Sequence, residues 1–365
     1  MKDLDKYRGC IIGGAVGDAL GGAIEFDSVE QIYAQYGENG ITEYSADVGA
    51  LITDDTQMTL YTANGILCAV TDQMLGRFDR SYADYIADCY KDWYDTQMSA
   101  SFGDKPTVRA WLKSVKELGA RRAPGNTCLN AIANGANGTL SEPINNSKGC
   151  GGVMRVAPIG LFFDGKTRRE QLGINYLGAQ AAALTHGHDL GFIPAAALVH
   201  IVSLAAHHPE ISLKEAVADA INACRESYGA YPHIEGFTQI MNEAIRLSAL
   251  DVSDLDAIEL LGEGWVAEEA LAIAVYCALK YENDFEKAII ASVNHGGDSD
   301  STGSITGNIL GARLGLSAIP KKFLEELELL SVITEVADDL FKADEVFKNG
   351  MDESWKRKYV ENKGL

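Results

Sequence analysis

Strand signals are scarce in this sequence, and so are the features that separate a chain into domains. Few stretches alternate Val, Ile, Thr or Tyr with polar residues, and only 8 of the 365 residues are proline. No run rich in proline, in serine and glycine, or in charge of one sign interrupts the body of the chain. We therefore expect one helical body, not a sheet protein or several linked domains.

Basic residues are also scarce. The chain has 31 lysine and arginine residues against 52 aspartate and glutamate residues, a net charge of −21 at pH 7. Sequence-independent binding to nucleic acid needs basic side chains against the phosphates, so we expect no nucleic-acid partner. The acidic excess is compatible with divalent cations or a basic protein partner, although solvated helix surface explains much of it.

Paired cysteines and long apolar runs are missing. The seven cysteines are scattered and never form Cys-x-x-Cys, which argues against a zinc ribbon and for reduced thiols. The most apolar run, residues 192–208, is interrupted by histidines and predicts a buried helix, not a bilayer span. Residues 1–10 are charged and lack a signal-peptide pattern. We expect a cytoplasmic protein with no membrane partner.

Helical periodicity is the dominant pattern. Apolar residues recur three and four positions apart over residues 55–70, 81–97, 107–118, 196–208, 212–227, 269–280 and 323–341. Many of these segments are apolar nearly all round, as in helices inside a large bundle. From residue 346 the chain is polar and mixed in charge, which predicts a peripheral or frayed tail at 346–365 after a single domain at 1–345.

Two segments place a glycine at every fourth position. The rows are Gly9, Gly13, Gly17, Gly21 and Gly303, Gly307, Gly311, Gly315. Each glycine inside a helix costs about 1 kcal/mol relative to alanine, so a row forgoes roughly 3 kcal/mol. Spacing of four keeps the glycines on one stripe. We predict that these two helices cross in the core with close backbone contact.

One of these segments begins with Asp298 and Asp300 after Gly296 and Gly297. On a regular helix the two carboxylates would point about 200° apart, but an irregular turn lets both reach one ion. Oxygen ligands of this kind suit Mg²⁺ or Mn²⁺. The alternative is helix capping by Asp300 or Ser301.

A second acidic turn, Thr53-Asp54-Asp55, precedes another helical run. Capping is again an alternative, because Asp54 and Gln57 have capping-box spacing. A cap needs only one oxygen, whereas this turn offers a hydroxyl and two carboxylates. Two such turns in one chain favour a two-metal site.

The amino-terminal glycine helix carries two further carboxylates. Asp18 lies within its glycine row, and Glu25 lies near its end. A carboxylate buried on such an element is costly without a partner. The alternative for Glu25 is an exposed position at the end of the helix.

Glycine and histidine residues provide weaker signals. Gly149, Gly151 and Gly152 could offer successive N–H groups to a pyrophosphate, or could simply form a loop. Cys150 between them has no adjacent His or Asn, so we predict a packing or lining role. Three histidines are candidates for a zinc site: His186, His188 and His295. The alternative roles for these side chains are helix capping and hydrogen bonding.

Five stretches follow one another in an order typical of a known family. They are GCIIGGAVGDALGGAIEF from Gly9, TDDTQMT from Thr53, GCGGVMRVAPIGL from Gly149, LTHGHDLGF from Leu184 and GGDSDSTGSITGNILGA from Gly296. Together, over about residues 7–315, the chain resembles the ADP-ribosylglycohydrolase family. Members include dinitrogenase-reductase-activating glycohydrolases and ADP-ribosylarginine hydrolases.

The resemblance implies an all-α, compact orthogonal helical bundle with a central di-metal cleft and two divalent cations, Mg²⁺ or Mn²⁺. By motif position the implied metal ligands are Thr53, Asp54, Asp55, Asp298, Asp300 and Ser301. Glu25 or Asp55 would act as the base or the substrate-orienting carboxylate. The implied substrate-binding residues are Gly149, Cys150, Gly151, Gly152, Met154 and His186.

Three departures from the family pattern concern the substrate. Cys150 stands where relatives often carry Asn, Lys148 where some carry an aromatic residue, and residues 101–112 match poorly. The His186-x-His188 pair is more similar to the arginine-linkage members than to the serine-linkage members.

The resemblance implies a metal-dependent hydrolase that removes ADP-ribose from modified protein, with ADP-ribosylated protein and ADP-ribose as its partners. We expect cleavage of the N-glycosidic bond to arginine. The alternatives are an O-glycosidic linkage, such as ADP-ribosylserine or O-acetyl-ADP-ribose, and a non-catalytic ADP-ribose-binding protein. If the order of the motifs is accidental, the remaining alternative for this chain is an unrelated helical metal-binding hydrolase.

Overall fold

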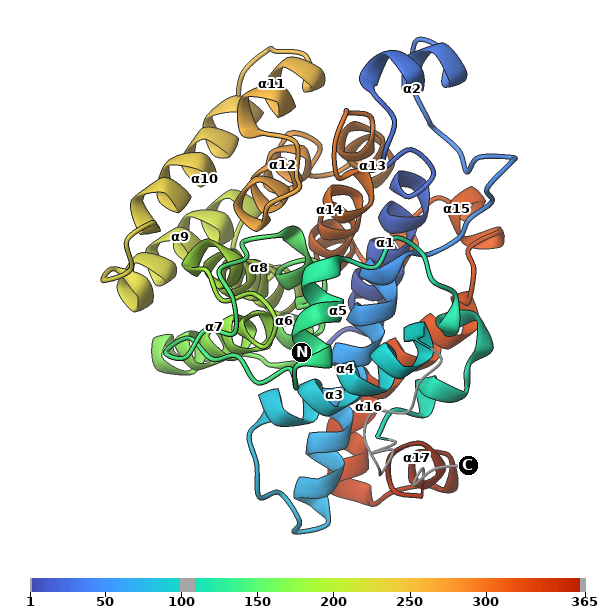
Figure 1. The fold of residues 1–365 in the computed structure, drawn as a ribbon, viewed down its shortest axis with the longest axis vertical. Helices are drawn as coiled ribbons and strands as arrows, with labels where there is room; N and C mark the ends of the chain where they lie inside the picture. The colour runs from blue at the N-terminus through green and yellow to red at the C-terminus, as the bar shows by residue number, and fades with distance from the viewer. Residues whose placement is uncertain (1, 99–108, 362–365) are drawn as a thin grey trace.

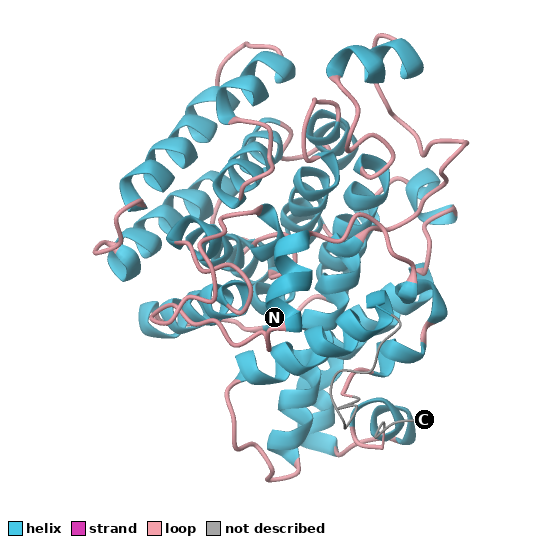
Figure 2. Cartoon of the chain, viewed as in Figure 1, coloured by secondary structure: helices cyan, strands magenta, loops and turns pink. Residues whose placement is uncertain are grey.

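The computed structural model describes residues 2–98 and 109–361, and in this part of the chain the regular secondary structure is helical (Figures 1 and 2). One isolated β-bridge joins Gly149 to Val266. The α-helices are α1 (Leu4–Gly21), α2 (Val29–Tyr36), α3 (Asp54–Met74), α4 (Tyr82–Met98), α5 (Asn126–Ala133), α6 (Ala157–Phe162), α7 (Arg168–Ala183), α8 (Asp189–His207), α9 (Leu213–Tyr228), α10 (Ile234–Ser248), α11 (Asp254–Leu261), α12 (Ala267–Lys280), α13 (Phe285–Val293), α14 (Ser299–Leu314), α15 (Lys321–Glu325), α16 (Leu330–Asn349) and α17 (Glu353–Tyr359). Short 3-10 helices are η1 (Trp111–Ser114), η2 (Lys116–Gly119), η3 (Cys150–Gly152) and η4 (Leu316–Ala318). The prediction of an all-α fold is confirmed.

Helix α8 lies inside the bundle. By length and composition this helix could cross a membrane, but 94% of its most apolar window is buried within the fold. Most of its side chains are apolar, on every face, because neighbouring helices cover it all round, and the buried polar His200 and Ser203 are hydrogen-bonded. The expectation of a buried helix over residues 192–208 is therefore confirmed, since α8 runs from Asp189 to His207.

Helices α1 and α14 run antiparallel at the centre of the bundle and touch through their glycine rows (Figure 1). A Cβ on Gly17 would lie 2.0 Å from the carbonyl oxygen of Gly303, and one on Gly307 would lie 1.9 Å from that of Gly13. Only glycine permits this approach, so the predicted crossing is confirmed. The last glycine of the second row, Gly315, instead ends α14 with a φ of +86°.

Two predicted helices differ from the observed structure. Within the described part of residues 107–118, the chain forms η1 and η2, which are separated by an extended Val115. The segment 323–341 is interrupted between α15 and α16, where Leu329 has a φ of +57°. Here the Glu328 carboxylate binds Arg122 and the Ile52 N–H, and these distant contacts outweigh the local helical preference.

The expected tail differs as well. Helix α16 continues to Asn349, and α17 packs against α3. The indole of Trp355 is 2% exposed and donates a hydrogen bond of 2.9 Å to Thr71 Oγ1. Trp355 and Tyr359 anchor this helical segment, so residues 346–361 are not frayed, although most of them are exposed or partly exposed, as expected of a peripheral segment; residues 362–365 lie outside the described part.

Candidate active site

The first acidic turn lies at the start of α3. Thr53 is its N-cap and accepts a hydrogen bond of 3.3 Å from the Asp55 N–H through its hydroxyl. Gln57 does not complete a capping box with Asp54, since its side chain binds Trp93 and Ala120 instead. The capping alternative is wrong for this pair, and Asp54 and Asp55 remain as carboxylates in the first turn.

The second acidic turn lies at the start of α14. Asp298 occupies the N-cap position and makes no side-chain capping bond, while Asp300 Oδ1 accepts the N–H of its neighbour Ser301 at 2.9 Å. The turn before it is irregular, as predicted, but for a different reason. Gly297 is required because a Cβ there would lie 2.0 Å from the carbonyl oxygen of Glu263, not because of a left-handed φ.

Glu25 joins the second acidic turn from the turn that follows α1. Carboxylate oxygens of Glu25, Asp298 and Asp300 all lie within 4.8 Å of one another. Glu25 is 9% exposed, so the alternative of an exposed position is wrong. Burial, followed by the charges of Asp300 and Asp298, raises the pKa of Glu25 to about 10.

These residues form what we call the acidic cluster: Glu25, Asp54, Asp55, Asp298 and Asp300. Burial and then the charge of Asp300 raise the pKa of Asp54, Asp55 and Asp298 well above the usual value. Among the described residues, none of the five makes an ion pair with lysine or arginine. Without cations these carboxyl groups therefore favour their protonated form, because no basic side chain of the described residues stabilises their negative charge.

Asp18 holds the first acidic turn in place. It is fully buried, and its carboxylate accepts hydrogen bonds from the backbone and the hydroxyl of both Thr53 and Thr56. Burial, then the charge of Asp300, raises the pKa of Asp18 to about 7. The sequence marked this residue as a carboxylate in need of a partner, and the structure supplies four hydrogen-bond donors for it.

The cluster fits the expected divalent cations. Its donors are oxygen atoms, which Mg²⁺ and Mn²⁺ prefer. Asp55 Oδ1 is buried without a hydrogen-bond partner, as expected of an oxygen reserved for a cation. Cations bound there would also stabilise the ionised form of these carboxylates, which burial and mutual repulsion destabilise. The two hydroxyls predicted as ligands lie at the same helix starts: Thr53 caps α3, and the Ser301 hydroxyl is 3.9 Å from Met154 Sδ.

The glycine loop at η3 lies beside the cluster. The Gly149 N–H donates to Ser147 Oγ at 3.3 Å and the Cys150 N–H to the carbonyl of Trp265 at 3.2 Å. The predicted row of free N–H groups is therefore reduced to Gly151 and Gly152. Burial, then the charges of Asp298 and Asp55, raises the pKa of the Cys150 thiol, which agrees with lining and not with a nucleophile.

His186 and Met154 flank this loop. The backbone carbonyl of Met154 accepts from the Thr59 hydroxyl at 3.4 Å, and its side chain is 2% exposed. A Cβ on Gly149 would lie 3.5 Å from His186 Nε2, and one on Gly151 would lie 3.4 Å from it. Burial, followed by the charge of Arg155, lowers the pKa of His186 to about 3, so the ring is neutral.

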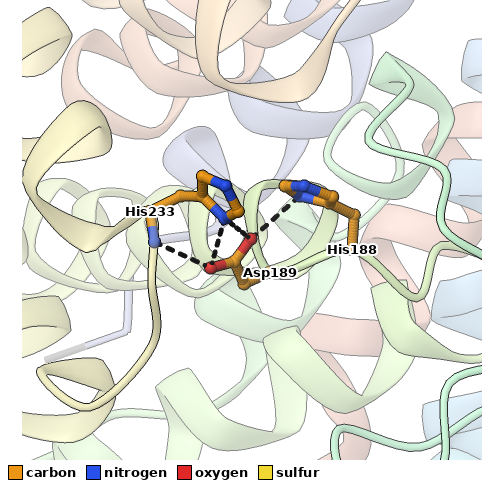
Figure 3. A group of neighbouring side chains, drawn as sticks. All are labelled: His188, Asp189 and His233. Atoms are coloured by element: carbon orange, nitrogen blue, oxygen red, sulfur yellow. Dashed lines mark hydrogen bonds and ion pairs between the residues drawn. The ribbon is translucent and has the colours of Figure 1, made fainter.

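The three histidines considered for zinc do not meet. His186 Nδ1 bonds to Thr185 and His295 Nε2 to Thr302. His188 instead lies beside Asp189 and His233, with Nδ1 atoms 2.9 and 2.8 Å from Asp189 Oδ1 (Figure 3).

We interpret the group of His188, Asp189 and His233 as a brace between α8 and α10. Asp189 also accepts the N–H groups of Leu190 and His233 at 2.9 and 3.0 Å. These donors, at the positive end of α8, already stabilise the carboxylate and oppose a cation. Its role is therefore to hold the loop that follows His186.

Comparison with known proteins agrees with this geometry. The family model described as ADP-ribosylglycohydrolase matches residues 1–349. The chain is 25% identical to "ADP-ribosylarginine hydrolase Tri1" of Serratia proteamaculans, over 93% of this chain and 80% of that protein. It is 24% identical to "ADP-ribosylhydrolase ARH3" of Mus musculus, over 90% and 88%.

A solved structure has the same fold. It is titled "ADP-ribosylglycohydrolase-related protein complex" and matches with a TM-score of 0.57 and 23% identity, over 93% of this chain and 98% of the matched chain. The family match extends over nearly all of the sequence and contains both acidic turns. The chain belongs to the ADP-ribosylglycohydrolase family.

Proposed function

We propose that this chain is a metal-dependent hydrolase that releases ADP-ribose from modified protein by cleaving its N-glycosidic bond to arginine. The observation that carries the proposal is the acidic cluster, whose buried carboxylates have no basic partner among the described residues. Thr53, Asp54, Asp55, Asp298, Asp300 and Ser301 would hold two Mg²⁺ or Mn²⁺ ions. We further propose that the protein acts in the cytoplasm.

When bound, the cations supply Lewis acidity toward the ribose hydroxyls and the attacking water. The chain's own carboxylates perform the remaining steps. Water attacks the anomeric carbon as its bond to the guanidinium nitrogen breaks, Glu25 or Asp55 takes the proton of the water, and the arginine leaves as a guanidine that is then protonated. The carboxylates also favour the positive charge that develops at the anomeric carbon. Asp18 keeps the first turn in position through its bonds to Thr53 and Thr56.

The arginine linkage has separate support. Phe26 follows Glu25 directly, is 74% exposed and stacks on Trp265 with ring centroids 6.1 Å apart. An exposed aromatic face next to a negative cluster suits the planar cation of a modified guanidinium. The similarity to an ADP-ribosylarginine hydrolase and the His186-x-His188 sequence point the same way.

The test is release of ADP-ribose from an arginine-modified protein and from a serine-modified protein, each with Mg²⁺, Mn²⁺ or EDTA. Metal-dependent release from arginine alone is the expected result. Release from serine would overturn the linkage and keep the site. Binding of ADP-ribose without release from either substrate would overturn the hydrolase and favour a binding protein.

A further inference from the structure

Arg155 is a fully buried cation without a carboxylate partner among the described residues. Its guanidinium lies 4.3 Å from the ring centroid of Tyr90, and its Nε has no hydrogen-bond partner. Its other contacts are Met58 Sδ at 3.5 Å, Cys128 Sγ at 3.3 Å, the Ala181 carbonyl at 3.2 Å and Thr185 Oγ1 at 2.6 Å. Burying an unpaired charge is costly, so its position calls for an explanation beyond packing.

The shortest of these contacts leads toward the candidate site. Thr185 Oγ1 lies 2.8 Å from His186 Nδ1 and 3.4 Å from the carbonyl oxygen of Ala182. Arginine can only donate, so the Thr185 oxygen accepts from Arg155 and keeps one proton of its own to donate. A hydroxyl donor prefers an acceptor near 2.8 Å, and 3.4 Å is outside the usual range. Cys128 also contacts the Thr185 hydroxyl, but its sulfur is only a weak acceptor, so the Thr185 proton goes to His186 Nδ1.

A ring nitrogen that accepts a hydrogen bond carries no proton in the neutral imidazole. The proton of His186 is then on Nε2, the atom on the side of Gly149 and Gly151. The positive charge of Arg155 and the burial of the ring both oppose a second proton. His186 thus presents a fixed N–H donor to the glycine loop at neutral pH.

We propose that Arg155 and Thr185 are positioning residues that hold His186 in its Nε2–H tautomer, so that this N–H donates to an oxygen of ADP-ribose bound at the glycine loop. This inference rests on the proposed function for the identity of the ligand. It assigns a role to a buried cation that makes no contact with the acidic cluster. It also explains why His186 is directly preceded by a hydroxyl residue.

The tautomer is measured directly by nitrogen NMR of the full chain with ¹⁵N-labelled histidine, assigned with a His186→Gln variant. We expect a pyrrole-type signal for Nε2 and a pyridine-type signal for Nδ1 of His186. A protonated Nδ1 in the unliganded protein would overturn the proposal. This measurement needs neither metal nor turnover, so its failure is distinct from a failure of the proposed function.

Thr185→Val removes the hydroxyl, and Thr185→Ser retains it. We expect Thr185→Val to lose the fixed tautomer and to bind ADP-ribose on the order of tenfold more weakly by calorimetry. Thr185→Ser should keep both properties. His295, which bonds to Thr302 through Nε2, is the internal control and should keep its signals in every folded variant.

An unchanged His186 tautomer in folded Thr185→Val would overturn the proposal, and so would equal affinities of the two variants for ADP-ribose. If Thr185→Val does not fold, the wild-type and Thr185→Ser spectra still decide it. Both spectra must then show the Nε2–H tautomer of His186. An Nδ1–H signal for His186 in either spectrum contradicts the proposed hydrogen bond from Thr185.

Discussion

Two sets of buried carboxylates in this molecule are treated differently by the fold. Asp339 is 6% exposed and binds Lys358 and the Tyr359 hydroxyl, and Asp95 is 6% exposed and binds Lys113 at 2.6 Å. The acidic cluster is buried to a similar extent, yet no lysine or arginine of the described residues pairs with it. Since burial costs both sets solvation, the unpaired set either binds protons or, in its ionised form, requires a cation from outside the chain.

This difference predicts opposite results when one member of each set is removed. A paired carboxylate contributes to folding, and loss of its partner should weaken the fold without a specific effect on chemistry. An unpaired carboxylate strains the metal-free fold, and its loss should abolish activity without weakening the fold.

The largest effect is expected for Asp300→Asn. The charge of Asp300 is the first electrostatic contributor, after burial, to the raised pKa of Asp54, Asp55 and Asp298. We expect metal-dependent release of ADP-ribose to fall roughly 1,000-fold or more, because a ligand to a cation worth several kcal/mol is lost. The metal-free variant should unfold at the same or a higher urea concentration than the wild type. Unchanged release would contradict the site.

Lys358→Met tests the paired set. It leaves Asp339 buried with only the Tyr359 hydroxyl at 2.7 Å, so we expect a loss of about 3 to 5 kcal/mol in the free energy of unfolding. Activity per folded molecule should not change. Lys356→Met is the matched control, because the pair of Lys356 with Glu353 is exposed to solvent and contributes little to stability. Equal losses of unfolding free energy in the two variants would show that burial does not increase the contribution of the Lys358–Asp339 pair to stability.

Gly17→Ala tests how the acidic turns are held. Its Cβ would lie 2.0 Å from the Gly303 carbonyl, so α1 and α14 must separate, at a cost of about 1 to 3 kcal/mol or more. The shift should also move Asp18, one residue away, and lower activity. Gly173→Ala in α7 is the control, since nothing lies within 4 Å of that Cβ, and should gain up to about 1 kcal/mol. Equal melting curves for the two variants would contradict the close packing of α1 against α14.

The smallest effect is a dependence of stability on pH. Burial and mutual repulsion raise the pKa of Asp18 to about 7 and of Glu25 to about 10, so the folded metal-free protein binds more protons than the unfolded chain. Its stability should therefore fall as the pH rises from about 5 to 9. Mn²⁺ should remove most of this fall, because cations stabilise the ionised carboxylates. Melting temperatures with EDTA and with Mn²⁺ at pH 6 and 8 measure it; identical pH slopes would be inconsistent with cation binding.

The sequence was sufficient for the features that short-range patterns encode. The glycine rows and the two acidic turns could be predicted because their patterns are local. The glycines lie four positions apart, and the carboxylates lie one or two positions apart. The family resemblance, carried by the order of five such stretches, added the helical fold. Glu25 and the second turn were placed in one site on that basis, and the structure brings their carboxylates within 4.8 Å.

The remaining features depend on residues far apart in the chain. Asp18 binds Thr53 and Thr56, and no local pattern shows that those hydroxyls reach it. Likewise, Glu328 breaks a predicted helix by binding Arg122, 206 residues away. The packing of α17 was not predicted either, because the segment is polar overall and the indole of Trp355 that anchors it is a single residue.

Calorimetric titration of the full chain with Mn²⁺ measures whether the acidic cluster binds divalent cations. We expect saturable binding of two ions by the wild type, loss of at least one in Asp300→Asn, and no change in Lys358→Met at a temperature where it is folded. Binding that is equal in the wild type and Asp300→Asn, or no binding in either, would contradict this expectation.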